Sequence, residues 1–424
     1  MEEHTVTERV RIGILGCGNI TRRYHLPQYP KIPEGRVVAL YDTNWVAAET
    51  AKELLLAALA QQAAPAKERG DALTAARCQE DQVGITVYER IEQMLEQVDA
   101  VDIATPPIWH GPHARMALER GLSVMVEKPM ARTWWEAAQI SPVVHGAKGF
   151  YQHNENWIYN PAYQLVRGLI EGGAVGRVQR VQWFQAHTGP DAFTPFWFSD
   201  PQAAGGGSLT DWGVHSTCCA WYLAGFDKQP TKVRSDGIGV KMRQRILAGR
   251  LQRVQVEDDA LLEVTLTDPA SGSETLLLVE GTWSRFAPSG KSSLIRVEGT
   301  RGEIEVEGSG FGTEETVHVT TRFAGERSQH LQSSIGRELM DESFLHEIRN
   351  FVVCVAQKQP PVVSYDIGLT TMAILGAGYL SEIRSRQAVT LEEFQDFCAG
   401  CEAKYPREQV ASEIIRYLMS PYAG

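Results

Sequence analysis

VRIGILGCGNIT, residues 10–21, is the stretch that decides the expected fold. Its apolar first half is typical of a buried strand, and a segment with helical character follows the glycines. The turn between them matches G-x-G-x-x-G, except that Thr21 replaces the third glycine. Gly16 makes the tight turn, and Gly18 lets the backbone approach a pyrophosphate at the N-terminus of the helix.

A second apolar run, residues 36–41, ends in Asp42. Strand, glycine turn, helix, strand and acid follow one another in a mononucleotide-binding unit, although the same order also serves purely structural roles. An acid at this point accepts hydrogen bonds from the ribose hydroxyls of adenosine, and its charge repels a 2′-phosphate. The sequence therefore predicts NAD rather than NADP, bound by Gly16, Gly18, Asn19, Ile20 and Asp42.

Strand and helix continue to alternate over roughly the first 155 residues. The helix expected at 111–120 stops at Gly121, which suits a helix C-terminus. Such alternation predicts a parallel sheet with helices on both faces. Three further strands are expected at 99–104, 122–126 and 149–152.

One alanine-rich stretch, residues 47–81, is too long for a compact unit of this kind. We interpret it as an elongated helix with a helical insertion at about 57–80, broken by Pro65 and Gly70. The expected role of the insertion is surface decoration or a contact with another subunit.

The pattern changes after about residue 155. A helix is expected at 160–172, with Asn160 as its cap and Gly172 at its end, and late helices at 344–357 and 367–384. Alternating apolar and polar residues predict an open, largely antiparallel sheet. Its strands are expected at 178–186, 260–267, 274–283, 294–298 and 303–306.

The predicted fold class is therefore α/β plus α+β. A Rossmann dinucleotide-binding domain is expected over residues 1–155, and an α+β substrate and oligomerisation domain over 156–395. A helical tail is expected over residues 396–424.

Composition argues against several classes of protein. The net charge of the 424-residue chain is -11 and its charges are scattered, which argues against a nucleic-acid or anionic-membrane partner. The first residues, Met1-Glu2-Glu3, lack the features of a secretory signal, and no apolar run reaches the roughly 18 residues that cross a bilayer. Seven sparse cysteines fit a reducing compartment, so a cytoplasmic location is expected.

Two groups of polar residues can carry chemistry. Lys128 follows a strand at the edge where doubly wound sheets bind their ligands, and a cation there can stabilise an alkoxide, although it could also simply pair with Glu127. Asp211 and His215 share one face of a helix by their spacing, and a glycine run before them lets the backbone pack close to a cofactor. Imidazole suits removal of a hydroxyl proton, which Asp211 could assist by orienting the ring or binding another hydroxyl; a plain surface pair is the alternative.

These residues fall within ordered motifs. Thr105-Pro106, His110, Ala114 and Ala117-Leu118 precede Glu127-Lys128-Pro129, and GGGSLTDWGVH at 205–215, VEDD at 256–259 and GTRG at 299–302 follow. Over about residues 10–395 the sequence resembles the glucose–fructose oxidoreductase and inositol dehydrogenase family, Gfo/Idh/MocA. Departures are the insertion, Thr21 and the tail.

The resemblance implies reversible hydride transfer between NAD(P) and a secondary alcohol of a sugar, inositol or related polyol, by a homodimer or homotetramer. It implies Lys128, Asp211 and His215 as the catalytic residues. It places the cofactor also against Thr105, Pro106, His110, Glu127 and Lys128.

Weaker expectations concern substrate and metal. Polar residues near the domain junction and a dense group of aromatic residues suggest substrate contacts at Asn154, His187, Trp197 and Trp212. Cys398 and Cys401 form a C-x-x-C without a second ligand pair, so no metal is expected.

Two rival functions remain open at this level. The first is an enzyme that retains NAD and oxidises its substrate transiently during glycoside cleavage or epimerisation. The second is a non-catalytic protein that binds NAD or a sugar; the presence of Lys128 and His215 argues against it.

Overall fold

The computed structural model describes residues 9–186, 189–190, 194, 196–284, 293–308, 315–323, 326–335 and 339–423. They form two compact units, each drawn from three stretches of chain. The first unit comprises Met1–Glu127, Ile140–Asn156 and Ser343–Tyr365, and the second comprises Lys128–Gln139, Trp157–Glu342 and Asp366–Gly424. The chain thus passes between units more often than a single boundary near residue 155 implies.

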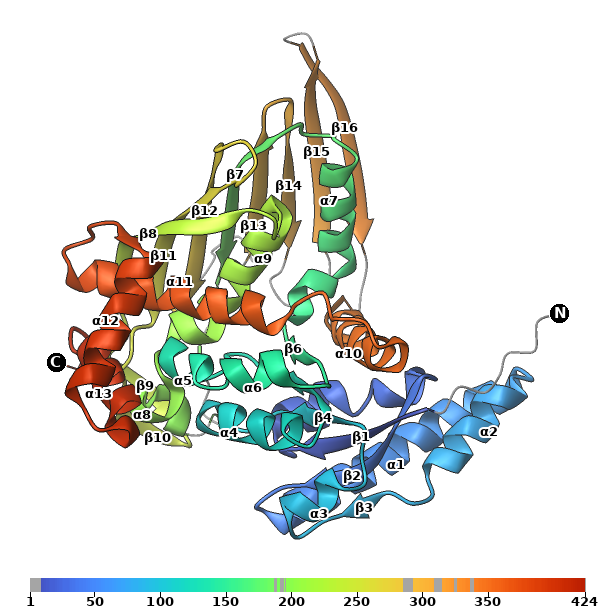
Figure 1. The fold of residues 1–424 in the computed structure, drawn as a ribbon. Helices are drawn as coiled ribbons and strands as arrows, with labels where there is room; N and C mark the ends of the chain where they lie inside the picture. Colours follow the sequence, from blue (N-terminus) through green and yellow to red (C-terminus); the bar gives the residue numbers. More distant parts are fainter. Residues whose placement is uncertain are drawn as a thin grey trace. The chain divides into compact units, whose positions relative to one another are not determined.

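The first unit is built on a six-stranded parallel sheet in the order β3-β2-β1-β4-β5-β6 (Figure 1). Strands β4 and β5 are buried along their whole length, as central strands of a parallel sheet are. This arrangement confirms the predicted Rossmann fold. The strands are β1 Val10–Leu15, β2 Gly35–Tyr41, β3 Thr86–Val87, β4 Ala100–Ile103, β5 Ser123–Val126 and β6 Tyr151–His153.

All helices of this unit except α10 lie between its strands along the chain. They are α1 Trp45–Glu68, α2 Ala72–Asp81, α3 Ile91–Leu95, α4 Pro107–Leu118, α6 Ser141–Gly146 and most of α10 Leu339–Gln357, with the short turns η1 Thr21–His25 and η2 Tyr29–Lys31. Helix α4 begins four residues earlier than expected, since Pro107 suits a first helical turn. Gly121 follows it with a φ of 79°, as its role after a helix end requires.

The alanine-rich stretch differs in part from expectation. Pro65 lies inside α1 and does not break it; the break comes at Gly70, which has a φ of 76°. Leu55 and Leu59 of α1 are buried in the core of the unit, in the same cluster as Phe351 of α10. The first part of the insertion therefore contributes to the core as well as to the surface.

The second unit is built on a mixed sheet of nine strands, in the order β16-β15-β14-β13-β7-β12-β11-β8-β17. Adjacent strands run antiparallel except β7 and β12, which agrees with the predicted, largely antiparallel sheet. The strands are β7 Val178–Gln185, β8 Gln229–Gly239, β11 Asp259–Thr267, β12 Glu274–Thr282, β13 Ser293–Gly299, β14 Gly302–Gly308, β15 Glu315–Phe323, β16 Glu326–Ile335 and β17 Val389–Thr390. A separate hairpin consists of β9 Gln244–Leu247 and β10 Arg250–Arg253.

Helices α7, α9 and α11 lie along one face of this sheet (Figure 1). The face carries buried residues such as Trp183, Leu262 and Val279, while alternate positions such as Leu261 and Leu278 remain partly exposed. The sheet is therefore covered by helices on one side only within the described chain. The helices and turns of the unit are η3 Asn156–Tyr159, α5 Trp134–Ala138, α7 Pro161–Glu171, η4 Phe196–Ser199, α8 Pro201–Ala204, η5 Leu209–Gly213, α9 Val214–Ala224, α11 Tyr365–Ile383, α12 Leu391–Lys404 and α13 Arg407–Met419.

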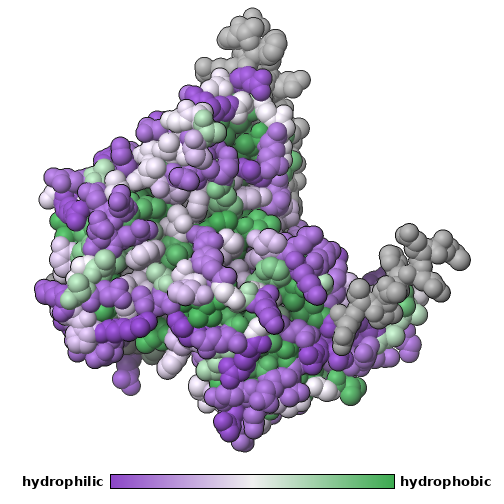
Figure 2. All heavy atoms as spheres, in the orientation of Figure 1, coloured by the Kyte–Doolittle hydropathy of each residue, from purple (hydrophilic) through white to green (hydrophobic). Residues whose placement is uncertain are grey.

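Hydrophilic residues are spread over the visible surface, with hydrophobic residues in small areas between them (Figure 2). Within the described residues, no helix is both long and apolar enough to cross a membrane. The predicted helical tail corresponds to α12 Leu391–Lys404 and α13 Arg407–Met419, so it begins before the expected residue 396.

Candidate active site

The glycine turn after β1 leaves room for a ligand at one glycine. Gly16 has a φ of 97°, and a Cβ there would lie 2.6 Å from the carbonyl oxygen of Ala104, so the protein itself requires glycine. Gly18 is exposed, and a Cβ there would meet no protein atom within 4 Å. The open space at Gly18 fits the approach of a pyrophosphate, with Asn19 exposed and Ile20 partly exposed beside it.

Thr21 stands at the position of the motif's third glycine and makes a side-chain contact there. Its side chain is fully buried, and its hydroxyl donates a 2.6 Å hydrogen bond to the carbonyl oxygen of Gly16. The following turn, η1, is a π-helix rather than an α-helix. The hydroxyl therefore links the glycine turn to the start of η1 by a hydrogen bond. A glycine at this position would only allow close packing.

Asp42 has the position expected of a ribose ligand. Its carboxylate is partly exposed and accepts hydrogen bonds from the backbone N–H groups of Cys17 at 2.8 Å and Asn44 at 2.7 Å. These bonds hold the carboxylate beside the glycine turn. The same side chain thus holds the glycine turn in place and puts a negative charge beside it.

The segment after β4 lies against the same turn. The methyl group of Thr105 would be 2.9 Å from a Cβ at Gly16, and Pro106 is exposed just before α4. His110 is buried, with Nε2 2.5 Å from the carbonyl oxygen of Thr105. His113 lies 3.3 Å from the Thr105 hydroxyl, and burial lowers its pKa to about 4.

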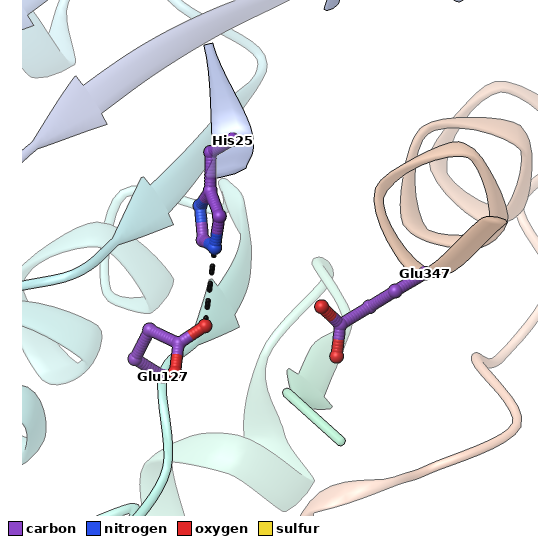
Figure 3. Close-up of side chains that lie close together, drawn as sticks. All are labelled: His25, Glu127 and Glu347. Atoms are coloured by element: carbon purple, nitrogen blue, oxygen red, sulfur yellow. Dashed lines mark hydrogen bonds and ion pairs between the residues drawn. The ribbon is translucent and has the colours of Figure 1, made fainter. Parts of the chain in front are cut away.

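Glu127, at the end of β5, belongs to a buried network (Figure 3). Its Oε1 lies 3.1 Å from Nε2 of His25 and accepts a 3.2 Å hydrogen bond from Asn154. Nδ1 of His25 lies 2.8 Å from Asp102, which also accepts a 2.8 Å bond from Tyr29. Burial opposes the charged imidazole, but the charges and hydrogen bonds of Asp102 and Glu127 outweigh it and hold the pKa of His25 well above its ordinary value.

Glu347 of α10 completes this cluster, and its carboxylate points toward Glu127 and His25 (Figure 3). One ligand atom from each of the three side chains lies within 4.8 Å of the others, a set that could hold a metal ion by residue type. A metal ligand needs a lone pair on the imidazole, however, and both nitrogens of His25 already face carboxylates as hydrogen-bond donors of an imidazolium do. We therefore interpret His25 and Glu127 as members of a structural hydrogen-bond network. Both carboxylate oxygens of Glu347 are buried without a hydrogen-bond partner among the described residues, and burial and the charge of Glu127 raise its pKa.

Lys128, the next residue along the chain, belongs to the second unit and meets Asp211 there. Its Nζ donates to Oδ1 and to the backbone oxygen of Asp211, both at 2.9 Å. The peptide bond between Lys128 and Pro129 is cis. The indole N–H of Trp283 donates to Oδ2 of Asp211 at 2.9 Å, so both carboxylate oxygens are held.

His215 lies in the first turn of α9, after the π-helical turn η5 that contains Asp211. It is 4% exposed, and its ring meets that of Trp212 edge-on with centroids 5.6 Å apart. Lys128, Asp211 and His215, the predicted catalytic residues, therefore all belong to the second unit. Sequence reasoning missed Trp283, which it took only as the end of a strand.

The glycine run before Asp211 has a different cause from the one expected. A Cβ at Gly205 would lie 2.1 Å from the carbonyl oxygen of Arg132, and one at Gly207 would lie 1.9 Å from that of Glu257. Protein atoms, all in the second unit, thus require these glycines, and a nearby cofactor is not needed to explain them.

The four residues suggested as substrate contacts differ in their surroundings. Asn154 is buried in the first unit beside Glu127, and Trp212 is buried in the second unit. Trp197 is partly exposed in η4, next to Phe198, whose ring stacks on Trp283 with centroids 5.7 Å apart. His187 lies outside the described residues.

All seven cysteines are free thiols. Cys398 and Cys401 lie in α12, the first buried and the second partly exposed. In the part of the chain that the structure describes, neither belongs to a group of three or more possible metal ligands.

Comparison with protein families gives two matches. The model described as "Oxidoreductase family, NAD-binding Rossmann fold" matches residues 10–153, and the "GFO/IDH/MocA C-terminal domain" matches residues 163–305. The first match identifies the first unit's sheet and glycine turn as an NAD-binding Rossmann domain.

Individual proteins resemble the chain to a lesser degree. The rhizopine catabolism protein MocA of Rhizobium meliloti is 31% identical over 52% of this chain and 64% of its own length, slightly under two thirds. The scyllo-inositol 2-dehydrogenase (NAD(+)) of Bacillus subtilis is 27% identical over 72% of this chain and 80% of its own. A structure of levoglucosan dehydrogenase with NADH shares the fold, with a TM-score of 0.70, 18% identity, and coverage of 91% of this chain and 99% of that one.

Proposed function

Because the chain belongs to the Gfo/Idh/MocA family of oxidoreductases, we propose that it transfers a hydride between NAD and a secondary alcohol of a sugar, an inositol or a related polyol. The proposal rests on the ion pair between Lys128 and Asp211, whose second carboxylate oxygen is bonded by Trp283. The pair lies in the same unit as His215. The names of the relatives support the substrate class, since two of them are dehydrogenases of an inositol and of an anhydrosugar.

The chain's own residues fit NAD at the glycine turn. A pyrophosphate has open space at Gly18, and Asp42 offers a fixed, partly exposed carboxylate to the ribose hydroxyls. When bound, NAD supplies the hydride acceptor, and the protein supplies position and charge.

In the proposed mechanism, His215 removes the proton of the reacting hydroxyl as hydride leaves the carbon. The ammonium group of Lys128 stabilises the negative charge that develops on the oxygen. Asp211 holds this ammonium through Oδ1, while Trp283 holds the other carboxylate oxygen. We therefore assign Asp211 to positioning Lys128, a role that the sequence alone did not suggest.

The test is a panel of sugars, inositols and glycosides, offered with NAD or with NADP and followed by the absorbance of the reduced nicotinamide. We expect reduction of NAD with at least one polyol and none without substrate. Lack of turnover by protein that binds NADH normally would contradict the proposal. Glycoside cleavage or epimerisation with NAD retained and no net reduction would favour the rival enzyme class.

We also propose a homo-oligomer and a cytoplasmic location. The helix-free face of the nine-stranded sheet offers a surface that a second copy could cover, and the seven free thiols suit a reducing compartment. Light scattering of the purified protein tests the first proposal, and cell fractionation tests the second.

A further inference from the structure

The residues just before Asp211 are held by hydrogen bonds to one buried glutamate. Glu257 is fully buried, and its Oε1 accepts hydrogen bonds from the backbone N–H groups of Gly207 and Leu209, each at 2.9 Å. Its backbone oxygen accepts a third bond, from Ser208 at 3.0 Å. Glu257 thus holds three consecutive residues just before Asp211.

A tyrosine from α11 holds this carboxylate in turn. The hydroxyl of Tyr379 donates to Oε1 of Glu257 at 2.7 Å. A Cβ at Gly206 would lie 2.4 Å from the same hydroxyl and 2.8 Å from the methyl group of Thr210, so any larger residue would crowd both side chains. Without this donor, the carboxylate would keep only backbone partners in a buried site.

The C-terminal end of the chain packs behind Tyr379. The ring of Tyr422, 3% exposed, lies next to that of Tyr379 with centroids 6.4 Å apart. Burial and the nearby charges of Glu257 and Glu382 raise the pKa of Tyr422, in agreement with its place beside the carboxylate. The chain end therefore fixes the ring whose hydroxyl holds Glu257.

The tail also contacts the other segments around the loop. Gln202 of α8, just before Gly205, donates to the backbone oxygen of Ser412 in α13 at 3.3 Å. Arg407 donates to Gln139 at 2.8 Å, in the short stretch that begins with Lys128.

We propose that the C-terminal tail, taken here as α12, α13 and the residues up to 423, positions the segment 205–213 that carries Asp211. It acts through Tyr422, Tyr379 and Glu257. The proposal rests on the proposed function, because the loop carries Asp211 and leads to His215. It treats the three residues as positioning residues, since none of them needs to touch the substrate. It also gives the tail a role in turnover.

Four variants separate this role from a general loss of stability. At position 379 the hydroxyl matters, so Tyr379→Phe lowers kcat about tenfold, the size of one hydrogen bond. At position 422 the ring matters, so Tyr422→Ala lowers kcat similarly while Tyr422→Phe retains it. Tyr417→Ala is the matched tail control, since Tyr417 is 45% exposed and packs on Phe397. NADH affinity stays unchanged in all four.

A second readout does not depend on activity. Hydrogen exchange of the peptide that spans residues 205–213 should speed up in Tyr379→Phe and Tyr422→Ala, but not in Tyr422→Phe or Tyr417→Ala. Because this measurement needs no substrate, it keeps its meaning even if the wild type turns over no polyol. Unchanged exchange and kcat in folded Tyr379→Phe would overturn the proposal, as would equal losses in Tyr422→Phe and Tyr422→Ala.

Discussion

At the scale of single residues, the site depends on how Asp211 is held. Lys128 bonds one carboxylate oxygen and Trp283 the other, so the carboxylate cannot turn without losing a partner. Lys128 is thereby fixed through its own ion pair, with a side chain 17% exposed. In the proposed mechanism, charge stabilisation belongs to Lys128 and proton removal to His215.

The separation predicts how the two residues respond to substitution. Lys128→Ala and His215→Ala should each lower kcat by about 10² to 10⁴-fold and leave NADH affinity nearly intact, because charge stabilisation and proton removal act on the reacting centre. Steady-state kinetics and NADH titration by fluorescence measure both quantities. A normal rate in His215→Ala would place the base elsewhere.

Asp42 predicts the choice of cofactor. A fixed carboxylate repels a 2′-phosphate, so catalytic efficiency should be higher with NAD than with NADP. Asp42→Asn removes the charge and leaves one side-chain oxygen where two now accept backbone N–H groups. It should narrow the preference by roughly tenfold, the size of one charge-assisted hydrogen bond. The control is Asp71→Asn, at the cap of α2, which should leave the preference unchanged. Equal catalytic efficiency with NAD and NADP in the wild type would show that Asp42 does not determine the choice of cofactor.

At the scale of elements, the sequence predicted the helices and strands whose pattern is set by neighbouring residues along the chain. Strands β1, β2, β4 and β5 of the first unit are largely apolar runs, whereas β3 is only two residues long and was not predicted. Helix α7 was bounded correctly by Asn160 and Gly172 because a cap acts within one turn. Strand β8 was missed: Pro230 and Gly237 interrupt its pattern, and its register shifts against β11. Strands β15 and β16 were missed because their sequences are rich in polar residues.

The residues of the candidate site divide in the same way. Lys128, Asp211 and His215 stand in compact motifs, and the structure brings Lys128 and Asp211 together. Trp283 and Tyr379 could not be found in this way, since sheet pairing and helix packing bring them in from distant parts of the chain. Their residue types suit a buried core equally well, so only the fold distinguishes a core tyrosine from one that holds Glu257.

Glu257 predicts a pH dependence of stability. Burial raises its pKa to about 7 despite hydrogen bonds that lower it, so the folded state retains the proton longer than the unfolded chain. Its contribution to stability is complete below the unfolded pKa, about 4.5, and is lost as pH rises through 7. The slope is at most about 1.4 kcal/mol per pH unit.

Glu257→Gln cannot ionise and should therefore lose less stability than the wild type between pH 4.5 and 7. Melting temperatures measured by differential scanning fluorimetry at several pH values give the two slopes. The matched control, Glu68→Gln at an exposed position on α1, should keep the wild-type slope. Parallel slopes for Glu257→Gln and the wild type would contradict the assignment.

At the scale of the whole molecule, the open face of the nine-stranded sheet is the feature that internal packing leaves unexplained. Leu261, Leu276 and Leu278 lie on it, partly exposed. Ion pairs lie among them, such as Arg180–Glu298 and Arg234–Glu263. A face that mixes apolar side chains with both signs of charge can meet a second copy of itself in a two-fold interface.

This reading predicts that one substitution in the middle of the face weakens assembly. Leu278→Glu would bury a carboxylate without a partner in such an interface, so the mass measured by light scattering should shift toward the monomer at micromolar concentration. Leu73→Glu is the matched control, since Leu73 is 86% exposed on α2 of the first unit, and it should keep the wild-type mass. If Leu278→Glu also keeps that mass while melting at the wild-type temperature, the subunits meet through another surface. A wild type that is monomeric across the whole concentration range would remove the interface altogether, and the partly exposed leucines would then be ordinary surface residues.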